Sequence, residues 1–311
     1  MTAAAWPDLP YPAWRDTAAT LQLWTQIVGK VRLALTPWVN HSWQVPFYVT
    51  ARGLGTSPIP IGSEILEIEF DFIGHRLAVR TSRGEERMLA LEPQTVTDFY
   101  RRVIDLLNGI GIAVAINETP SELPNPIRFS QDRTHAAYDA DAAHRFWRAL
   151  VQADRIFKLF RSGFLGKASP VHFFWGSFDL AVTRFSGRKA PLHPGGVPGL
   201  PDDVAREAYS HEVSSAGFWP GNDAFPQAAF YSYAYPEPAG FRSRPVTLGA
   251  AFDATLGEFN LPYDAVRGAA EPDGLLLDFL STTYTAAADS GHWDRAALEC
   301  AMGVPARVRP I

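Results

Sequence analysis

Residues 66–72 read LEIEFDF, so that apolar and acidic side chains alternate without a break. Successive side chains of a β-strand point to opposite faces, and this strand therefore has one apolar and one charged face. The apolar set is Leu66, Ile68, Phe70 and Phe72. One buried and one solvated face is typical of an antiparallel sheet that covers a core on one side only.

Outward from this strand, apolar residues at three- and four-residue spacing predict helices. The first helix is predicted to begin near Asp16 and to end before Pro37, and a second to end at Gly109. Residues 112–116 are predicted to form a short buried strand. Further helices are expected at 140–162 and 274–288, and further strands at 171–186, 211–219 and 228–235. The fold class predicted is α+β with largely antiparallel sheet, because strands and helices do not alternate one for one.

The chain is expected to consist of two helix–strands–helix halves. Residues 1–117 form an N-terminal α+β half, 118–137 a proline-containing linker, and 138–311 a C-terminal half that carries the site. HSWQVPFYVTARG in the first half is echoed by VHFFWGSFDLAVTRFSG in the second. An internal duplication is one hypothesis for this echo, and two unrelated antiparallel sheets with helices on one face are the alternative.

The composition excludes several classes of function. The chain has 311 residues, of which 47% are hydrophobic, and a net charge of −5, without the basic excess that nucleic acid or an anionic membrane surface requires. Cys300 is the single cysteine, which excludes an intrachain disulfide and a cysteine-based metal cluster. We expect no signal peptide in the first residues and no membrane span. The expected setting is the cytoplasm of a bacterial cell.

Aromatic residues are concentrated in one segment. The chain has 20 Phe, 10 Tyr and 9 Trp, and residues 170–241 hold a disproportionate share of them together with three of the eight histidines. Phosphate-binding loops and the common hydrolase and metalloprotease motifs are absent from the sequence. Aromatic walls with a few convergent polar groups are typical of binding pockets, so this segment is predicted to form an aromatic-lined pocket with a histidine cluster.

Four residues of this segment are candidates for acid/base catalysis: His172, His211, Glu212 and Asp179. His172 is predicted to begin a strand that places Phe174 on its own face and Asp179 on the opposite face. His211 and Glu212 are adjacent, so that on a strand they point to opposite faces, whereas at a bend both can serve one site. A core histidine bonded to a backbone carbonyl is the alternative for His172.

A metal site is a further hypothesis. His172, His193 and His211, with Glu212 as the carboxylate, are ligand types that suit zinc or non-haem iron. Their spacing matches none of the common local metal signatures. The cofactor is therefore unknown, with a transition metal (Zn or Fe) as one alternative and metal-free acid/base chemistry as the other.

The substrate-binding candidates are cationic or aromatic. Arg184 and Arg188 flank Phe185-Ser186-Gly187 and are predicted to clamp an anionic group, since a guanidinium offers a planar fork to carboxylate or phosphate. A solvated ion pair is the alternative for each. The predicted pocket wall consists of Phe174, Trp175, Phe178, Trp219, Tyr231 and Tyr233. Tyr231, Tyr233 and Tyr235 alternate onto one strand face, as either a pocket wall or the polar-tipped side of a sheet.

The runs SPVHFFWGSFDLAVTRFSGR, EAYSHEVSSAGFWPG and FYSYAYPEP, with TLQLWTQIVGKVRLAL and TSPIP before them, resemble those of a bacterial family of uncharacterised proteins, a domain of unknown function. The resemblance covers roughly residues 6–300. It implies that the whole chain is one family unit, and it implies no activity or catalytic residues.

The function expected is that of a small-molecule enzyme, a metal-dependent oxidoreductase or a hydrolase, that acts on an anionic or aromatic substrate. The alternatives are a non-catalytic binding protein for a hydrophobic or aromatic ligand, and a structural protein whose aromatics form an oligomer interface. The partner expected is a small-molecule ligand, with no nucleic acid and no membrane, and with a homo-oligomer left open.

Overall fold

The alternating stretch becomes β4 (Glu64–Asp71) at the centre of the first sheet. The structure is a computed structural model and describes residues 5–309. Leu66, Ile68 and Phe70 are buried, and Glu67 is exposed, as the alternation predicts. The sheet is antiparallel, with the order β1-β2-β4-β5-β6 and β3 paired to β4. Its other strands are β1 (Tyr48–Val49), β2 (Gly53–Gly55), β3 (Ile59–Ile61), β5 (Arg76–Thr81) and β6 (Glu86–Ala90).

The second sheet is also antiparallel and has the order β11-β12-β10-β9-β8-β7. Its strands are β7 (His172–Phe174), β8 (Asp179–Lys189), β9 (His211–Trp219), β10 (Ala229–Tyr235), β11 (Ala251–Asp253) and β12 (Glu258–Pro262). The α+β class with antiparallel sheets is confirmed, whereas the two different strand orders do not show a duplication.

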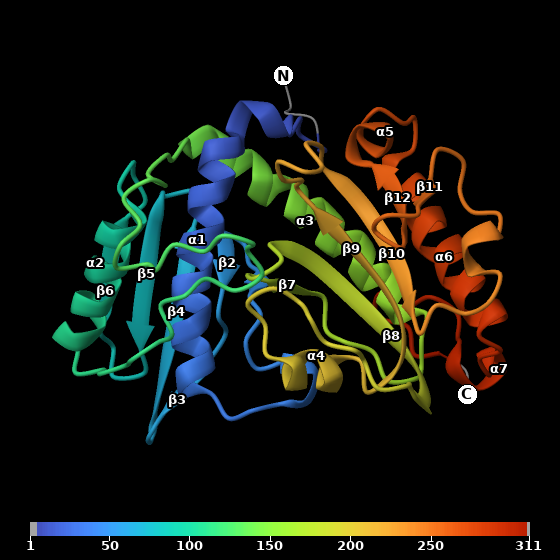
Figure 1. The fold of residues 1–311 in the computed structure, drawn as a ribbon, viewed down its shortest axis with the longest axis horizontal. Coiled ribbons are helices and arrows are strands. Elements are labelled where there is room, and N and C mark those ends of the chain that lie inside the picture. Colours follow the sequence, from blue (N-terminus) through green and yellow to red (C-terminus); the bar gives the residue numbers. More distant parts are fainter. Residues whose placement is uncertain (1–4, 310–311) are drawn as a thin grey trace.

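Helix α1 (Tyr11–Leu35) stands between the two sheets, as Figure 1 shows. Trp24 of this helix stacks on Phe99 of α2 (Val96–Gly109), with ring centroids 4.5 Å apart. In the other direction, α3 (Ala140–Ser162) and α6 (Pro272–Ser290) cover one face of the second sheet. The shorter helices are α4 (Asp202–Ala208), α5 (Tyr263–Arg267), α7 (Arg295–Leu298), η1 (Asn40–Ser42) and η2 (Phe241–Ser243).

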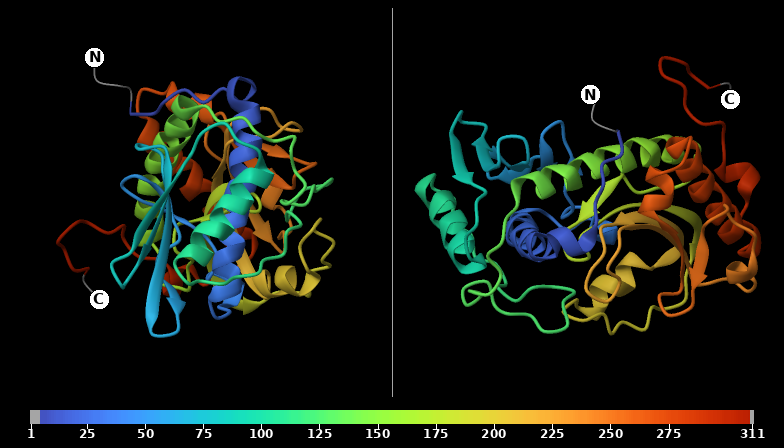
Figure 2. Two further views of the ribbon diagram at one scale, coloured as in Figure 1. Left: turned by 90° about the vertical axis from the view of Figure 1, so that its left-hand side faces the viewer. Right: turned by 90° about the horizontal axis from the view of Figure 1, so that it is seen from above.

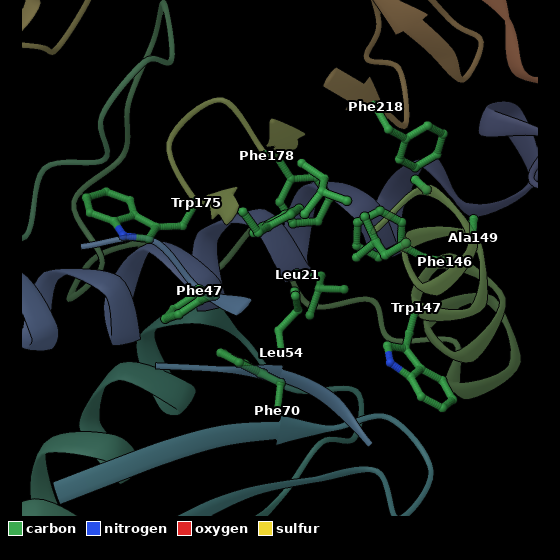
Figure 3. Packing of buried hydrophobic residues seen from close by; sticks show 14 of the residues in the cluster. Leu21, Phe47, Leu54, Phe70, Phe146, Trp147, Ala149, Trp175, Phe178 and Phe218 are labelled. Atoms are coloured by element: carbon green, nitrogen blue, oxygen red, sulfur yellow. The ribbon is translucent and has the colours of Figure 1, made fainter. Parts of the chain in front are cut away.

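One hydrophobic core runs through both halves of the described chain. Phe47 and Phe173 exchange two backbone hydrogen bonds of 2.8 Å, so the two sheets are joined at this point. The Trp175 indole donates to the Val45 carbonyl oxygen at 3.0 Å and packs over Gly29 of α1. Figure 3 shows Phe47, Phe146 and Phe178 in the shared core.

Two sequence-based predictions of secondary structure are wrong. Residues 112–116 form no strand, because the chain leaves α2 as an irregular segment. Residues 171–186 form a hairpin of β7 and β8 instead of a single strand. The helices at 96–109 and 140–162 are confirmed. Within residues 5–309, every helix is too short or too polar to span a lipid bilayer.

Candidate functional site

The register of the second sheet separates its side chains onto two chemically different faces. Leu180, Phe218 and Phe230 are opposite one another on the face that packs against α3 and α6. The opposite face is polar, and we call it the polar face. It includes His172, Phe174, Asp179, Ala181, Thr183, Ser215, Gly217, Tyr231, Tyr233, Tyr235, Glu258 and Asn260, with the apolar Phe185 and Val213 at one end. α4 lies on this side of the sheet, away from α6 (Figure 2).

The hairpin between β7 and β8 brings Asp179 onto the same face as His172. Phe178 adopts a left-handed conformation, with φ at 62°, and its N–H donates to the Phe174 carbonyl oxygen at 2.8 Å. The turn reverses the chain, so that Asp179 pairs with Phe174. A single strand over residues 171–186 would place Asp179 on the face opposite to His172. This prediction is wrong, because the turn at residues 175–178 lies between the two strands and Asp179 pairs with Phe174.

Asp179 is the buried carboxyl group of the polar face. It accepts hydrogen bonds from the hydroxyl groups of Tyr231 and Ser177. Burial raises its pKa above the usual value, although both hydrogen bonds act in the opposite direction. Tyr231 reaches Asp179 by crossing β9 at Gly217, where a Cβ atom would lie 2.3 Å from the Tyr231 ring. Glycine at position 217 is therefore what admits Tyr231 to this position.

A second set of hydroxyl groups continues along the face. The hydroxyl oxygens of Tyr209 and Tyr233 are 2.8 Å apart, and those of Thr183 and Ser215 are also 2.8 Å apart. His193, in the loop before α4, stacks on Tyr209 with ring centroids 4.7 Å apart. Burial raises the pKa of Tyr209, and that of Tyr233 well above its usual value, so both phenols stay protonated at neutral pH.

Glu122 faces this sheet from the segment that the sequence assigns to the linker. Its backbone is left-handed, with φ at 60°, which is a strained conformation for a residue with a side chain. Its carboxyl group lies against Gly176, where a Cβ atom would be 2.1 Å from Glu122 Oε1. Burial and then the negative charge of Asp179 raise the pKa of Glu122 to about 7. No sequence motif marks this residue, and only the fold brings it to the site.

A polar stripe of α1 holds the Glu122 segment in place. Gln22, Gln26 and Lys30 are four residues apart and so share one face of the helix. Gln26 pairs with both the carbonyl oxygen and the N–H of Ser121, at 3.0 and 2.7 Å. One turn before Gln26, Gln22 donates to the Gly176 carbonyl oxygen at 2.7 Å. One turn after it, Lys30 donates to the Thr119 carbonyl oxygen, also at 2.7 Å. Helix α1 thereby positions both the segment that carries Glu122 and the β7–β8 turn that precedes Asp179.

Glu258 of β12 adds a third carboxyl group to the polar face. Burial raises its pKa to about 7, against a hydrogen bond from Asn260 that lowers it and with the negative charges of Asp179 and Asp253 adding to the rise. Within the described part of the chain, no arginine or lysine forms an ion pair with Glu122, Asp179 or Glu258. Asp179 and Glu258 of the polar face, with Glu122 opposite them, are therefore three carboxyl groups without a compensating cation among the described residues.

The predicted histidine set does not converge. His172 is 1% exposed, and burial lowers its pKa to about 4, so its ring is neutral at pH 7. His211 lies at the start of β9, where its Nδ1 atom is 3.0 Å from the Ser210 hydroxyl oxygen, whereas His193 stacks on Tyr209. Among residues 5–309, no group of three or more His, Cys, Asp or Glu side chains is placed to hold a metal ion. The predicted site of His172, His193 and His211 is thus not formed.

The predicted pairing of His211 with Glu212 and the predicted anion clamp are not formed either. Glu212 pairs instead with Arg188 at 2.6 Å and accepts a hydrogen bond from Ser186. Arg184 lies on the apolar face, where its guanidinium carbon is 3.5 Å from the centroid of the Phe160 ring. Adjacent strand residues point to opposite faces, which separates Glu212 from His211.

The predicted aromatic wall is divided between core and site. Trp175 and Phe178 belong to the core, Phe178 stacked on Phe146 with centroids 5.1 Å apart (Figure 3). Phe174, Tyr231 and Tyr233 lie on the polar face and remain partly accessible. Trp219 is also partly accessible, and it stacks on Phe225. Tyr231, Tyr233 and Tyr235 lie on one face of β10, as their alternation in the sequence predicts.

Fold and site together define an α+β protein with two antiparallel sheets, one of which bears an acidic, tyrosine-lined face. Over residues 6–300, the sequence matches the model of the family of unknown function DUF5996, and the chain belongs to this family. The extent of the match agrees with the resemblance noted from the sequence. Comparison with curated proteins and with solved structures gives no match.

Proposed function

We propose that the protein is a small-molecule enzyme that performs acid/base chemistry on the polar face of the second sheet, with Glu122 and Asp179 as the acid/base pair. The observation that supports this proposal most is the combination of a strained backbone and a raised pKa at Glu122. A carboxyl group in strained backbone, without an ion pair among the described residues and with a pKa raised to about 7, destabilises the fold when it is ionised. Such groups are typical of catalytic sites.

The two carboxyl groups differ in environment, which supports different roles for them. Asp179 is held by the Tyr231 and Ser177 hydroxyl groups, so its orientation is fixed. Glu122 has no side-chain hydrogen bond to the described residues, and its pKa near neutrality suits it to take up and release a proton at pH 7. In this proposal Glu122 exchanges the proton with the substrate, and Asp179 keeps the Glu122 pKa high.

The tyrosines would provide the binding surface. The rings of Tyr231 and Tyr233 are 6.1 Å apart and inclined by 19°, and both present partly accessible faces. Aromatic faces with hydroxyl groups bind small molecules that combine an apolar and a polar part. His172 would contribute as a neutral ring next to Phe174, with centroids 4.5 Å apart, without carrying a positive charge.

The test is a screen of ester, amide and glycoside reporter substrates and of alcohol oxidation with the wild-type protein. Any activity found is then measured in Glu122→Gln, with Glu86→Gln as a matched control because Glu86 is exposed on β6 of the first sheet. Loss of the general acid/base is expected to lower kcat by about 10²–10⁴-fold without a decrease in Tm at pH 7. An activity that survives in both Glu122→Gln and Asp179→Asn contradicts the proposal.

A further inference from the structure

Lys167 lies in an irregular segment that pairs with β8 next to β7. Its carbonyl oxygen accepts from the Phe185 N–H at 3.0 Å, and the next residue, Ala168, forms an antiparallel bridge to Arg184. Paired residues of an antiparallel sheet point to the same face, so the side chains of Lys167 and Phe185 are neighbours. The Lys167 Nζ atom is 4.9 Å from the centroid of the Phe185 ring and 5.4 Å from that of Trp43. Two aromatic rings therefore flank this amine.

His41 of η1 contacts the same nitrogen atom. Its Nε2 atom lies within hydrogen-bond distance of Lys167 Nζ, and its Nδ1 atom is 3.1 Å from the Ala208 carbonyl oxygen. A carbonyl oxygen only accepts, so Nδ1 carries the ring proton and Nε2 presents its lone pair to the lysine. His41 is 5% exposed, and its ring packs on Phe185 with centroids 4.7 Å apart. Its backbone is left-handed, with φ at 60°, so a strained conformation holds the imidazole against the amine.

The chain has four lysines, and the surroundings of Lys167 differ from those of the other three. Lys158 pairs with a carboxylate of its own helix at 2.6 Å, whereas Lys30 is 5% exposed and donates to a backbone carbonyl oxygen. Lys189 is an exposed lysine at the end of β8. Lys167 is exposed too, and partial burial of its amine lowers its pKa, against the opposing influence of the Glu207 charge. Lys167 thus combines access from solvent with a neighbouring base.

We propose that Lys167 is a nucleophilic amine that forms an imine with a small aldehyde or ketone. The lysine nitrogen adds to the carbonyl carbon, and one proton of the amine passes to the carbonyl oxygen. His41 Nε2 takes the second proton and returns it to the resulting hydroxyl group, which leaves as water when the carbon–nitrogen double bond forms. Amine and carbonyl compound thereby give imine and water, without an oxidant or a reductant. The rings of Trp43 and Phe185 provide an apolar wall for the rest of the substrate.

The experiment is reductive labelling of the folded full chain with benzaldehyde and cyanoborohydride at pH 7. Hydride transfer converts an imine into a stable secondary amine, and peptide mass spectrometry measures the rate at which each lysine gains a benzyl group. We expect Lys167 to be labelled at least about 10-fold faster than Lys189, because a positioned general acid/base contributes about 10²–10⁴-fold. Unfolding in guanidinium chloride is expected to remove this difference. Equal rates for Lys167 and Lys189 in the folded chain overturn the proposal, as does a difference that persists in the unfolded chain.

Three variants test the roles of the two residues. Lys167→Arg keeps a cation between the rings without a nucleophilic amine and is expected to lose the fast labelling, whereas Lys189→Arg keeps it. His41→Asn removes the acceptor nitrogen that contacts Lys167 and places at this position a residue that tolerates a left-handed backbone. It is expected to slow the labelling of Lys167 at least about 10-fold, with the Tm as the check of the fold. Fast labelling of Lys167 that survives in folded His41→Asn overturns the proposal. The wild-type comparison of Lys167 with Lys189 decides the matter even if His41→Asn loses its fold.

This inference goes beyond the proposed function, because the chemistry of Lys167 and His41 uses neither Glu122 nor Asp179. Labelling of Lys167 is therefore expected to be as fast in Glu122→Gln as in the wild type. Failure of the labelling test overturns the imine and leaves the acid/base pair unaffected, whereas an activity that survives in Glu122→Gln and Asp179→Asn overturns that pair and leaves Lys167 unaffected.

Discussion

The two sheets differ in the partners that surround a buried aspartate. On the outer face of the first sheet, Asp71 is buried, and Arg52 and Arg76 lie 2.8 and 3.1 Å from its Oδ2 atom. The N–H groups of Ile73 and Gly74 also donate to it. On the polar face of the second sheet, Asp179 is similarly buried, and its side-chain partners among the described residues are two hydroxyl groups and no arginine or lysine.

The pKa shifts of the two groups differ in sign for this reason. Burial alone would raise the pKa of Asp71, but hydrogen bonds from Gly74, Arg52 and Ile73 bring it below its usual value. Burial raises the pKa of Asp179, and no cation among residues 5–309 opposes this shift. A compensated carboxylate stabilises the fold around it, whereas an uncompensated one is costly to keep and so indicates a functional role.

The largest effect is expected from a pair of matched substitutions. Asp71→Asn removes the charge between two arginines and is expected to lower the free energy of unfolding by about 2–4 kcal/mol at pH 7. Asp179→Asn replaces a carboxyl group that has no cationic partner, so its effect is expected to stay within about 1 kcal/mol. Urea unfolding of both variants measures the difference. Equal losses of stability in the two variants would mean that the sheets do not differ in the way described.

The next largest effect is expected in the pH dependence of the free energy of unfolding. Glu122 has a raised pKa in the folded state, so the folded protein binds more protons than the unfolded chain between about pH 4.5 and 7. Stability contributed by this group is therefore present below pH 4.5 and is lost as the pH rises to 7, by up to about 3 kcal/mol. The free energy of unfolding of the wild type, relative to Glu122→Gln, is expected to fall across this range. A difference that does not change with pH would contradict the raised pKa.

A modest effect on stability, with a larger one on the site, is expected for Gly217→Ala. The added Cβ displaces the outer end of the Tyr231 ring, which can swing away, so the cost is expected to be about 1–2 kcal/mol. The hydrogen bond from Tyr231 to Asp179 is lost in the process, and any activity found with the reporter substrates is expected to fall with it. Gly55→Ala of β2 is the control, because its Cβ would meet only the Thr50 methyl group, at 3.1 Å. Equal activity in the two variants would remove Tyr231 from the site.

The sequence predicts those parts of the molecule that depend on local periodicity. The alternation at 66–72 becomes β4, the apolar spacing at 140–162 becomes α3, and the alternating tyrosines share one face of β10. The aromatic segment 170–241 supplies β7 to β10, which is most of the sheet that bears the site. Each of these features is decided by residues close together in the chain.

Features decided by long-range contacts are not predicted. Glu122 joins Asp179 only because α1 holds Ser121 through Gln26, nearly a hundred residues away in the chain. Arg184 resembles an anion-binding residue in sequence, but the register of β8 directs it to the apolar face and the ring of Phe160. The turn at Phe178 is a left-handed conformation at a non-glycine residue, which local propensity does not indicate.

The pKa of Glu122 tests the central claim most directly. A ¹³C NMR titration of the side-chain carboxyl carbons, with Glu122 assigned by comparison with Glu122→Gln, measures it in the full chain. The account predicts a pKa of about 7, and a downward shift in Asp179→Asn because the neighbouring negative charge is removed. A Glu122 carboxyl group that titrates near about 4.3, the ordinary value for glutamate, would contradict it.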